Sequence, residues 1–204
     1  MKITVLGKGK LGSAIVRYAS QFGCEEVSFE ESDVVIDASA PEVARKHIER
    51  ALNANKPIVV ATTGWYDAMD QVKQLVIEKN GFCLYSSNFS LLIQDLLKIL
   101  PQIQLTNFDC FIEETHHTTK KDSPSGTALS LSRALQNVPI HSHRVEDVVG
   151  IHKIVIENRM ERLVIEHQGL DRGVYAQGIL QLLPQIGDKK GMFDLKEFLC
   201  SLPL

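Results

Sequence analysis

Reactive side chains are concentrated between Glu114 and Leu129, where the sequence is ETHHTTKKDSPSGTAL. His116 carries an imidazole that titrates near neutral pH, and Lys120 carries a mobile cation that can also donate a proton. We expect both in the loop that follows a strand predicted over 108–114, where one ligand can reach them together. These residue types indicate chemistry on an anion that must receive a proton.

A helix start follows this loop directly. Ser125, Gly126 and Thr127 stand behind Pro124, and a helix is predicted over 126–136. Small residues at a helix start leave backbone N–H groups accessible, and the helix dipole there favours a carboxylate or a phosphate. Alone, such a start usually only caps a helix, and adjacent histidines usually lie in a surface loop. Their combination in one segment favours a functional site.

A glycine loop occupies the start of the chain, with the sequence GKGKLG at residues 7–12. It follows a strand predicted over 2–6 and opens a helix, which is the context that a dinucleotide-binding fingerprint requires. The three glycines would permit a tight turn, close approach to a pyrophosphate and close packing of helix on strand. The residues predicted to bind the cofactor here are Gly7, Lys8, Gly9, Lys10, Leu11 and Gly12.

Strands and helices alternate as far as residue 88. Apolar strands are expected over 34–38, 57–61 and 82–85, with helices over 42–53 and 68–79 between them. This alternation predicts an α/β fold, a Rossmann-like parallel sheet with helices on both faces. Ligands bind beyond the carboxyl ends of such strands, so the turns at 38–41, 61–64 and 86–89 are expected near the cofactor. A turn without function is the simpler interpretation of each one alone.

The pattern changes in the second half of the chain. Strands are expected over 108–114, 143–147, 152–158 and 162–167, with one helix among them, and helices follow over 172–183 and 194–199. This pattern predicts a second α+β lobe, built on an open mixed sheet, that would hold a substrate. The predicted domains are 1–88 with about 178–204 for the dinucleotide, and 89–177 for substrate binding and oligomerisation.

Composition argues against several other classes of protein. A hydrophobic content of 44% and a net charge of −3 are ordinary, and give no reason to expect nucleic acid. No apolar run approaches the roughly 18 residues of a membrane span, and no signal peptide is apparent, so a soluble cytoplasmic protein is expected. Cys24, Cys83, Cys110 and Cys200 form no Cys-x-x-Cys pair and are expected to be reduced core residues.

A metal site is not expected. Adjacent histidines in an extended chain point to opposite faces, so His116 and His117 do not easily share one ion. No third ligand lies at zinc spacing from them. His152 and His167 fall in expected strands and are assigned structural roles, and His47 is assigned to helix packing.

The segment around His116 resembles the signature of the dihydrodipicolinate reductase family, E-x-H-H-x-x-K-x-D-x-P-S-G-T-A, and matches it at every fixed position. The resemblance extends over almost the whole chain. It implies reduction by NADH or NADPH of a cyclic dicarboxylate, 4-hydroxy-tetrahydrodipicolinate, to tetrahydrodipicolinate in lysine and diaminopimelate biosynthesis. It also implies a cytoplasmic homotetramer, and the open sheet of the second lobe has edges that need pairing.

The resemblance also assigns residue roles. His116 matches the acid/base residue of the family, and Lys120 matches its proton donor. Asp122 is expected to orient the loop, because a carboxylate that faced a dianionic substrate would repel it. Arg172 matches a position that is usually basic in the family, and either meets a carboxylate or caps a helix. The expected substrate-binding residues are His117, Ser125, Gly126 and Thr127. Besides the glycine loop, the expected cofactor contacts are Ala61, Thr62, Thr63, Ser86, Ser87, Asn88 and Phe89.

The chain departs from the family pattern in its second strand. Too few residues separate Gly12 from Asp33 for a helix and then a full strand with its own crossover, which needs about a dozen residues or more. That strand must be shortened or absent, and with it the acid that usually bonds the adenosine ribose. Ala61 and Ser87 also replace a usual glycine and a frequent proline. The nearby glutamates favour NADH modestly, although Lys8 and Lys10 could serve the phosphate of NADPH.

Two other classes of function remain open. The chain could be a non-catalytic nicotinamide-binding sensor or scaffold on the same fold. It could also be a dehydrogenase that acts on another small imine or amino dicarboxylate. His116 and Lys120 favour the reductase, because a sensor does not need a proton donor beside an anion site.

Overall fold

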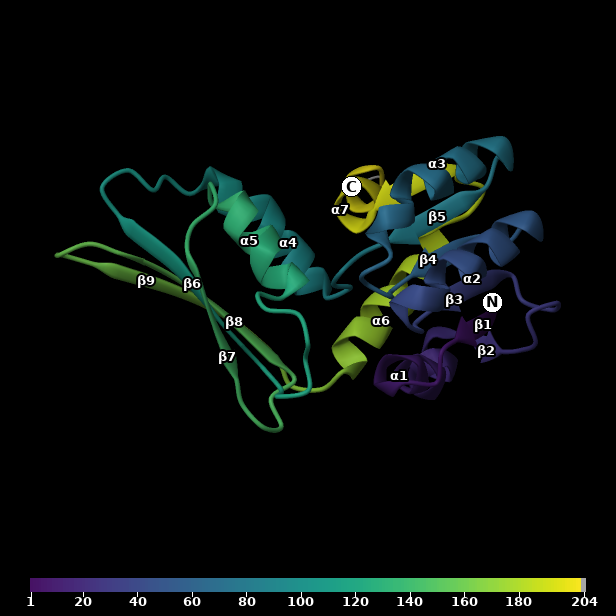
Figure 1. Ribbon diagram of the computed structural model, residues 1–204, viewed down its shortest axis with the longest axis horizontal. Coiled ribbons are helices and arrows are strands. Elements are labelled where there is room, and N and C mark those ends of the chain that lie inside the picture. Colours follow the sequence, from purple (N-terminus) through teal and green to yellow (C-terminus); the bar gives the residue numbers. More distant parts are fainter. Residues whose placement is uncertain (203–204) are drawn as a thin grey trace. The chain divides into compact units, whose positions relative to one another are not determined.

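Short apolar strands form the centre of the first structural unit, which comprises Met1–Ser90 and the chain from Gly173 onward (Figure 1). The structure is a computed structural model and describes residues 1–202. Six parallel strands form the sheet of this unit in the order β10-β5-β4-β3-β1-β2. Their bounds are β1 Lys2–Leu6, β2 Glu25–Glu26, β3 Val34–Asp37, β4 Ile58–Val60, β5 Phe82–Tyr85 and β10 Gly191–Asp194.

Helices cover both faces of this sheet, because its central strands are apolar on both sides. Val35, Ile58 and Val60 form one core cluster with the buried faces of α2 and α3. Alternate residues such as Ile36 and Val59 are buried on the opposite face. The helices of this unit are α1 Lys10–Ala19, α2 Pro41–Asn53, α3 Met69–Glu78, α6 Gly173–Leu182 and α7 Leu195–Cys200, with short 3₁₀ turns at Ser20–Phe22, Tyr66–Ala68 and Leu183–Gln185.

The second strand is shortened, as the sequence predicted. β2 pairs with β1 only at Lys2 and Ile3. The chain then turns away at 28–32 and enters β3 without an intervening helix. The first sheet is therefore Rossmann-like but lacks the full second strand of that fold.

β10 was not predicted. Its four residues are only partly buried and begin with a glycine, so they carry little strand signal. The helix predicted from Asp194 begins instead at Leu195. Asp194 is its N-cap and forms a capping box with Glu197.

The second unit comprises Leu91–Arg172 and contains a mixed four-stranded sheet in the order β7-β6-β8-β9. β6 pairs parallel with β7 and antiparallel with β8, which pairs antiparallel with β9. Buried side chains of Ile112, Leu131 and Ile154 join one face of this sheet to its helices. The elements are α4 Leu91–Ile99, a 3₁₀ turn Leu100–Gln102, β6 Asp109–His116, α5 Gly126–Ala134, β7 Ile140–Arg144, β8 Gly150–Glu157 and β9 Arg162–Gly169.

Two of the strands predicted in this unit exist but have different ends. β6 continues through His116, which therefore ends a strand instead of lying in the loop after it. β7 ends at Arg144, earlier than the strand predicted over 143–147. Pairing with β6 begins at Pro139, whose carbonyl accepts from the N–H of Ile112 at 2.9 Å.

The units divide after Ser90 and before Gly173, near but not at the predicted bounds of 88 and 178. The later division falls at Gly173 because α6 packs against α1, so that the whole helix belongs to the first unit. Among residues 1–202, no helix combines the length and the apolar character that a membrane crossing needs.

Candidate active site

The end of β6 places two polar side chains on the same sheet face as the apolar core. Cys110, Ile112, Glu114 and His116 alternate with more exposed neighbours, so all four point toward the helix-covered face. Glu114 is 0% exposed and His116 is 6% exposed. A carboxylate and an imidazole buried this deeply require partners, because removing charge from water is costly.

Glu114 is held by two such partners. Its Oε1 accepts a hydrogen bond from Nη1 of Arg144 at 2.9 Å, and its Oε2 contacts Nδ1 of His116. Burial acts to raise the pKa of the Glu114 carboxyl, but the Ser142 hydroxyl, Arg144 and His116 outweigh it and leave that pKa below its ordinary value. Glu114 is therefore an anion that orients His116 through one of its ring nitrogens.

The pKa of His116 also lies below its ordinary value. Burial is the largest cause, and Lys120 and Arg144 add to the lowering, while Glu114 opposes it. His116 is consequently neutral at neutral pH in the free protein. An anion bound beside it would favour the protonated ring, so the site can take up a proton with such a ligand.

Lys120 and Asp122 close the loop beside this pair. Lys120 Nζ lies 2.8 Å from Asp122 Oδ1, and Arg144 Nη2 donates to the Asp122 carbonyl at 2.6 Å. Arg144 therefore ties both Glu114 and the loop to β7. This geometry gives Asp122 the orienting contacts expected of it.

The predicted helix start forms α5, with Ser125 as its N-cap. The Ser125 Oγ accepts from the N–H of Ala128 at 3.1 Å, so the serine hydroxyl is already engaged in capping. Thr127 is buried and Gly126 is half-buried in the first turn. His117 is half-buried, and its Nδ1 lies 2.6 Å from the Thr119 hydroxyl.

Sequence reasoning missed His152 as a member of this cluster. The register of β6 and β8 pairs Glu114 with His152, and the rings of His116 and His152 lie 5.1 Å apart at an angle of 73°. His152 is 1% exposed, and its Nε2 lies 3.4 Å from the Ser125 Oγ. Only the pairing register makes these residues neighbours, and the sequence carries no signal for that register.

The structure also assembles a potential metal-binding group that was not expected. One ligand atom each from Glu114, His116 and His152 lies within 4.8 Å of the others. The guanidinium of Arg144 already pairs with Glu114, and the cation of Lys120 lies close enough to lower the pKa of His116. Cations beside the ligand atoms oppose a metal ion, so the arrangement fits acid–base chemistry better.

The glycine loop of the first unit has the geometry of a dinucleotide-binding turn. Gly7 has a φ of +115°, and a Cβ there would lie 2.2 Å from the Ala38 carbonyl oxygen. A Cβ on Gly12 would lie 2.0 Å from the Gly7 carbonyl oxygen. Gly9 is the N-cap of α1 and uses no side-chain cap, which leaves its surroundings open for an anion. The three glycines thus meet the three predicted requirements.

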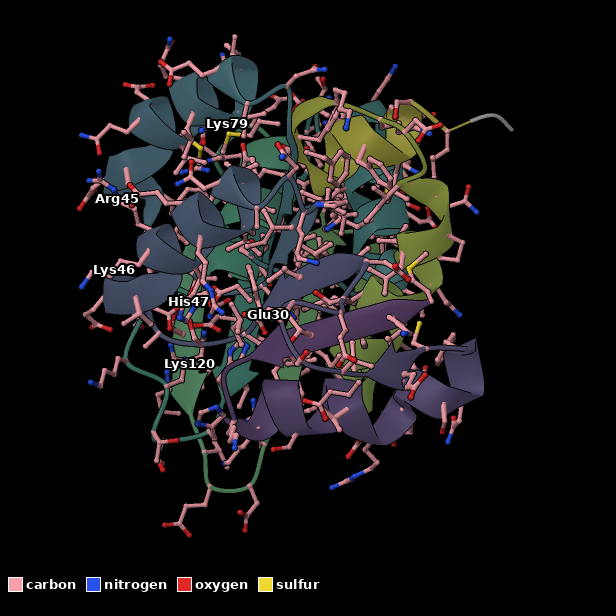
Figure 2. All side chains as sticks on the ribbon, turned by 90° about the vertical axis from the view of Figure 1, so that its right-hand side faces the viewer. Glu30, Arg45, Lys46, His47, Lys79 and Lys120 are labelled. Carbon is pink, nitrogen blue, oxygen red and sulfur yellow. The ribbon has the colours of Figure 1, made fainter. Side chains whose placement is uncertain are left out.

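A buried carboxylate joins the turns that follow β3 and β4. Asp37 is 0% exposed and accepts from the Thr62 hydroxyl at 2.5 Å and from the Ser39 hydroxyl at 2.6 Å. His47 Nδ1 lies 2.7 Å from the same carboxylate. Figure 2 shows Arg45 and Lys46 of α2 directed outward, whereas His47 lies against the body of the unit.

The contacts of Asp37 involve Thr62, one of the residues predicted to bind the cofactor. The Thr62 hydroxyl donates to Asp37 and also accepts from the Ser39 N–H at 2.9 Å, so it holds the loop together. Thr63 is exposed and Ala61 is half-buried. His47 is therefore a partner of the buried carboxylate and not only a packed side chain.

The turn after β5 likewise contains both exposed residues and buried residues that hold the turn in place. Ser86 Oγ accepts from the Asn88 N–H at 3.1 Å, and Phe89 is only 2% exposed. A Cβ on Gly178 of α6 would lie 1.8 Å from the Phe89 carbonyl oxygen, so this turn packs closely on α6. Ser87 is exposed, whereas Asn88 is buried.

The acids near β2 have other partners or are exposed. Glu30 pairs with Arg50 at 3.3 Å, and Glu31 accepts from the Ser28 hydroxyl at 2.9 Å. Glu25 and Glu26 are exposed within β2.

The expectation for the cysteines holds only in part. Cys24 and Cys83 are buried, Cys110 is half-buried and Cys200 is exposed, and all four are free thiols. Cys200 lies on the exposed side of α7, so it is not a core residue.

A dinucleotide loop on a parallel sheet, together with a buried acid–base cluster on a mixed sheet, defines a two-unit nicotinamide-dependent oxidoreductase. The family model "Dihydrodipicolinate reductase, N-terminus" matches residues 22–89, and "Dihydrodipicolinate reductase, C-terminus" matches residues 89–199. The chain belongs to the dihydrodipicolinate reductase family.

Individual relatives agree with this assignment. A 4-hydroxy-tetrahydrodipicolinate reductase of Thermosipho africanus is 32% identical and aligns over 98% of both chains. One from Christiangramia forsetii is 29% identical over 99% of both chains. The structure of a dipicolinate-bound dihydrodipicolinate reductase from Paenisporosarcina sp. TG-14 has a TM-score of 0.76 at 19% identity and covers 95% of this chain and 97% of its own.

Proposed function

We propose that this chain reduces 4-hydroxy-tetrahydrodipicolinate to tetrahydrodipicolinate with NADH or NADPH, in lysine and diaminopimelate biosynthesis. The observation that carries the proposal is the buried Glu114–His116 pair, oriented by Arg144, in a chain of this family. Relatives that align over nearly the whole chain bear the name of this reductase.

The reduced nicotinamide, when bound, supplies the hydride. One proton enters with the hydride, and the hydroxyl group of the substrate leaves as water. His116 and Lys120 are the residues that would move these protons, with Glu114 fixing the orientation of His116. Ser125, Gly126 and Thr127 place the positive end of α5 where a substrate carboxylate can bind. His117 is assigned to substrate binding on the family signature.

In the first unit, the glycine loop from Gly7 to Gly12 holds the pyrophosphate. The exposed residues Thr63 and Ser87 are available to contact the cofactor directly. Ala61 and Ser86, both half-buried, flank the same sheet end. Thr62, Asn88 and Phe89 shape these turns from inside.

We further propose a homotetramer joined through the sheet of the second unit. Val164 is 43% exposed on β9, and β7 and β9 are unpaired edges of that sheet among the described residues. Light scattering at micromolar concentration measures the assembly directly, and a monomeric mass contradicts this proposal. The free thiols are consistent with a reducing, cytoplasmic setting.

The test of the reaction is oxidation of NADH or NADPH in the presence of freshly condensed pyruvate and aspartate semialdehyde. We expect a loss of absorbance that requires both precursors and that falls strongly in Lys120→Ala. If the protein binds the cofactor but shows no substrate-dependent oxidation at saturating concentrations, the sensor interpretation replaces the enzyme.

A further inference from the structure

His152 is the most deeply buried titratable side chain of the second unit that has no part in the proposed reaction. It lies on β8, paired in register with Glu114 on β6 and His167 on β9. Its ring lies 5.1 Å from the His116 ring and 6.3 Å from the His167 ring. The imidazole therefore lies between the acid–base pair and the outer strand.

His152 also reaches the helix start. Its Nε2 lies 3.4 Å from the Ser125 Oγ. That oxygen already accepts from the Ala128 N–H, so the hydroxyl hydrogen of Ser125 is available to donate to the ring. In this arrangement Nε2 is the acceptor, and Nδ1 carries the ring hydrogen.

The His152 ring also lies close to the acid–base pair. Nδ1 of His152 is buried and has no hydrogen-bond partner among residues 1–202. One ligand-type atom of His152 lies within 4.8 Å of those of both Glu114 and His116.

We infer that His152 is a positioning residue that couples Ser125, at the start of α5, to the Glu114–His116 pair. His152 thereby fixes the distance between the start of α5, which is proposed to bind the substrate carboxylate, and the imidazole of His116. The inference rests on the proposed function, because it assigns the substrate carboxylate to α5.

The charge state of His152 fits this role. Burial lowers the pKa of His152 to about 3, with His116 and His167 contributing. A neutral imidazole can accept from Ser125 and still keep one ring N–H, whereas a protonated ring has no acceptor. It also adds no cation to a site that already contains Lys120 and Arg144.

Two substitutions separate coupling from simple space filling. His152→Phe keeps a flat ring but removes both hydrogen-bonding atoms, whereas His152→Gln keeps an acceptor and a donor in a smaller side chain. The matched control is His167→Phe, the same change on β9, one strand further from Ser125. Titration of dipicolinate onto the protein with cofactor present measures carboxylate binding at the start of α5. The turnover rate measures proton transfer by the Glu114–His116 pair.

We expect His152→Phe to weaken dipicolinate binding about 10-fold and to lower kcat about 10-fold, because the change removes one or two buried hydrogen bonds. His152→Gln should restore most of both losses, and His167→Phe should stay within about 2-fold of the wild type. Equal defects in His152→Phe and His152→Gln, or a His152→Phe protein that matches the wild type, overturn the inference.

A second measurement does not depend on the folding of His152→Phe. In the wild-type protein the imidazole nitrogen resonances of His152 should report a neutral ring, and Ser125→Ala should shift them more than those of His167. Unshifted His152 resonances in Ser125→Ala overturn the coupling. If the wild-type protein turns over the substrate but these tests fail, the inference about His152 is wrong and the proposed function stands.

Discussion

Each unit of this protein contains a buried carboxylate paired with an imidazole near the end of a strand. Asp37 pairs with His47 in the first unit, and Glu114 pairs with His116 in the second. Both carboxylates are 0% exposed. The two pairs differ in their remaining partners, since Asp37 accepts from the hydroxyl groups of Ser39 and Thr62, whereas Glu114 also pairs with a cation, the guanidinium of Arg144.

The difference shows that the surrounding groups decide what such a pair does. The donors to Asp37 come from two turns and from α2, so that carboxylate ties together backbone segments beside the glycine loop. Cations surround the Glu114–His116 pair, and together with burial they keep the pKa of His116 below its ordinary value. We therefore assign the first pair to architecture and the second to proton transfer.

The largest expected effect comes from making the same substitution in both pairs. His116→Gln should lower kcat by about 10²-fold or more with little change in cofactor affinity, because a general acid is lost. His47→Gln should instead raise the KM for the cofactor only about 3-fold. The Gln amide can still donate to Asp37, so the turns beside the glycine loop should shift only slightly. Steady-state kinetics with both substrates varied measure both effects. Near-normal turnover in His116→Gln removes histidine from the mechanism and gives its role to water or Lys120.

The next effect concerns stability. Asp37→Asn should lower the free energy of unfolding by about 2–3 kcal/mol, because an amide cannot accept from every donor that now faces the buried carboxylate. Urea denaturation measures this change, and the exposed residue Asp188 in the same unit supplies the control Asp188→Asn. A loss no larger than that of the control means that Asp37 does not hold the turns together.

A third effect is the dependence of the free energy of unfolding on pH, and it concerns His152 beside the Glu114–His116 pair. In the unfolded chain His152 takes up a proton below about pH 6.5, but in the folded protein its pKa is about 3. Stability from this residue is therefore fully present above pH 6.5 and is lost as the pH falls toward 3. At pH 5 the loss is about 2 kcal/mol relative to neutral pH.

Unfolding measured by urea at pH 7 and pH 5 tests this statement. His152→Phe should lose about 2 kcal/mol less than the wild type over this interval, whatever its stability at pH 7. The same loss in both proteins means that His152 is not held neutral in the folded state.

The smallest expected effect is the choice of cofactor. No Arg or Lys occurs between Arg17 and Arg45, and the shortened β2 supplies no clear partner for the ribose. We expect NADH to be preferred by no more than about 10-fold, or roughly 1.4 kcal/mol. Kinetics with both cofactors decide this. A large preference for NADPH that disappears in Lys10→Ala shows that the glycine-loop lysine sets specificity instead.

Several elements were predictable because their signals are local. The glycine loop stands between a strand and a helix, and its glycines meet the steric requirements that the motif implies. Ser125 was predicted to open a helix and does so as the N-cap of α5. The shortened second strand followed from chain length alone, and the structure confirms it.

Other elements depended on contacts between distant segments. β10 joins the edge of the first sheet beside β5, and its own four residues show little strand pattern. His116 was placed in a loop, but pairing with β7 extends β6 through it. In each case hydrogen bonds from another strand decided the local structure.

The sequence by itself determined the family, the alternation of strands and helices, and the segment that contains the candidate proton donors. Glycine geometry, helix capping and apolar periodicity act within a few residues, so they can be recognised in a linear chain. Only the tertiary structure decided that Glu114 contacts Arg144 and faces His152 across the sheet, and that Asp37 binds the Thr62 hydroxyl. These contacts follow from strand register and burial, which join residues that are far apart in the sequence.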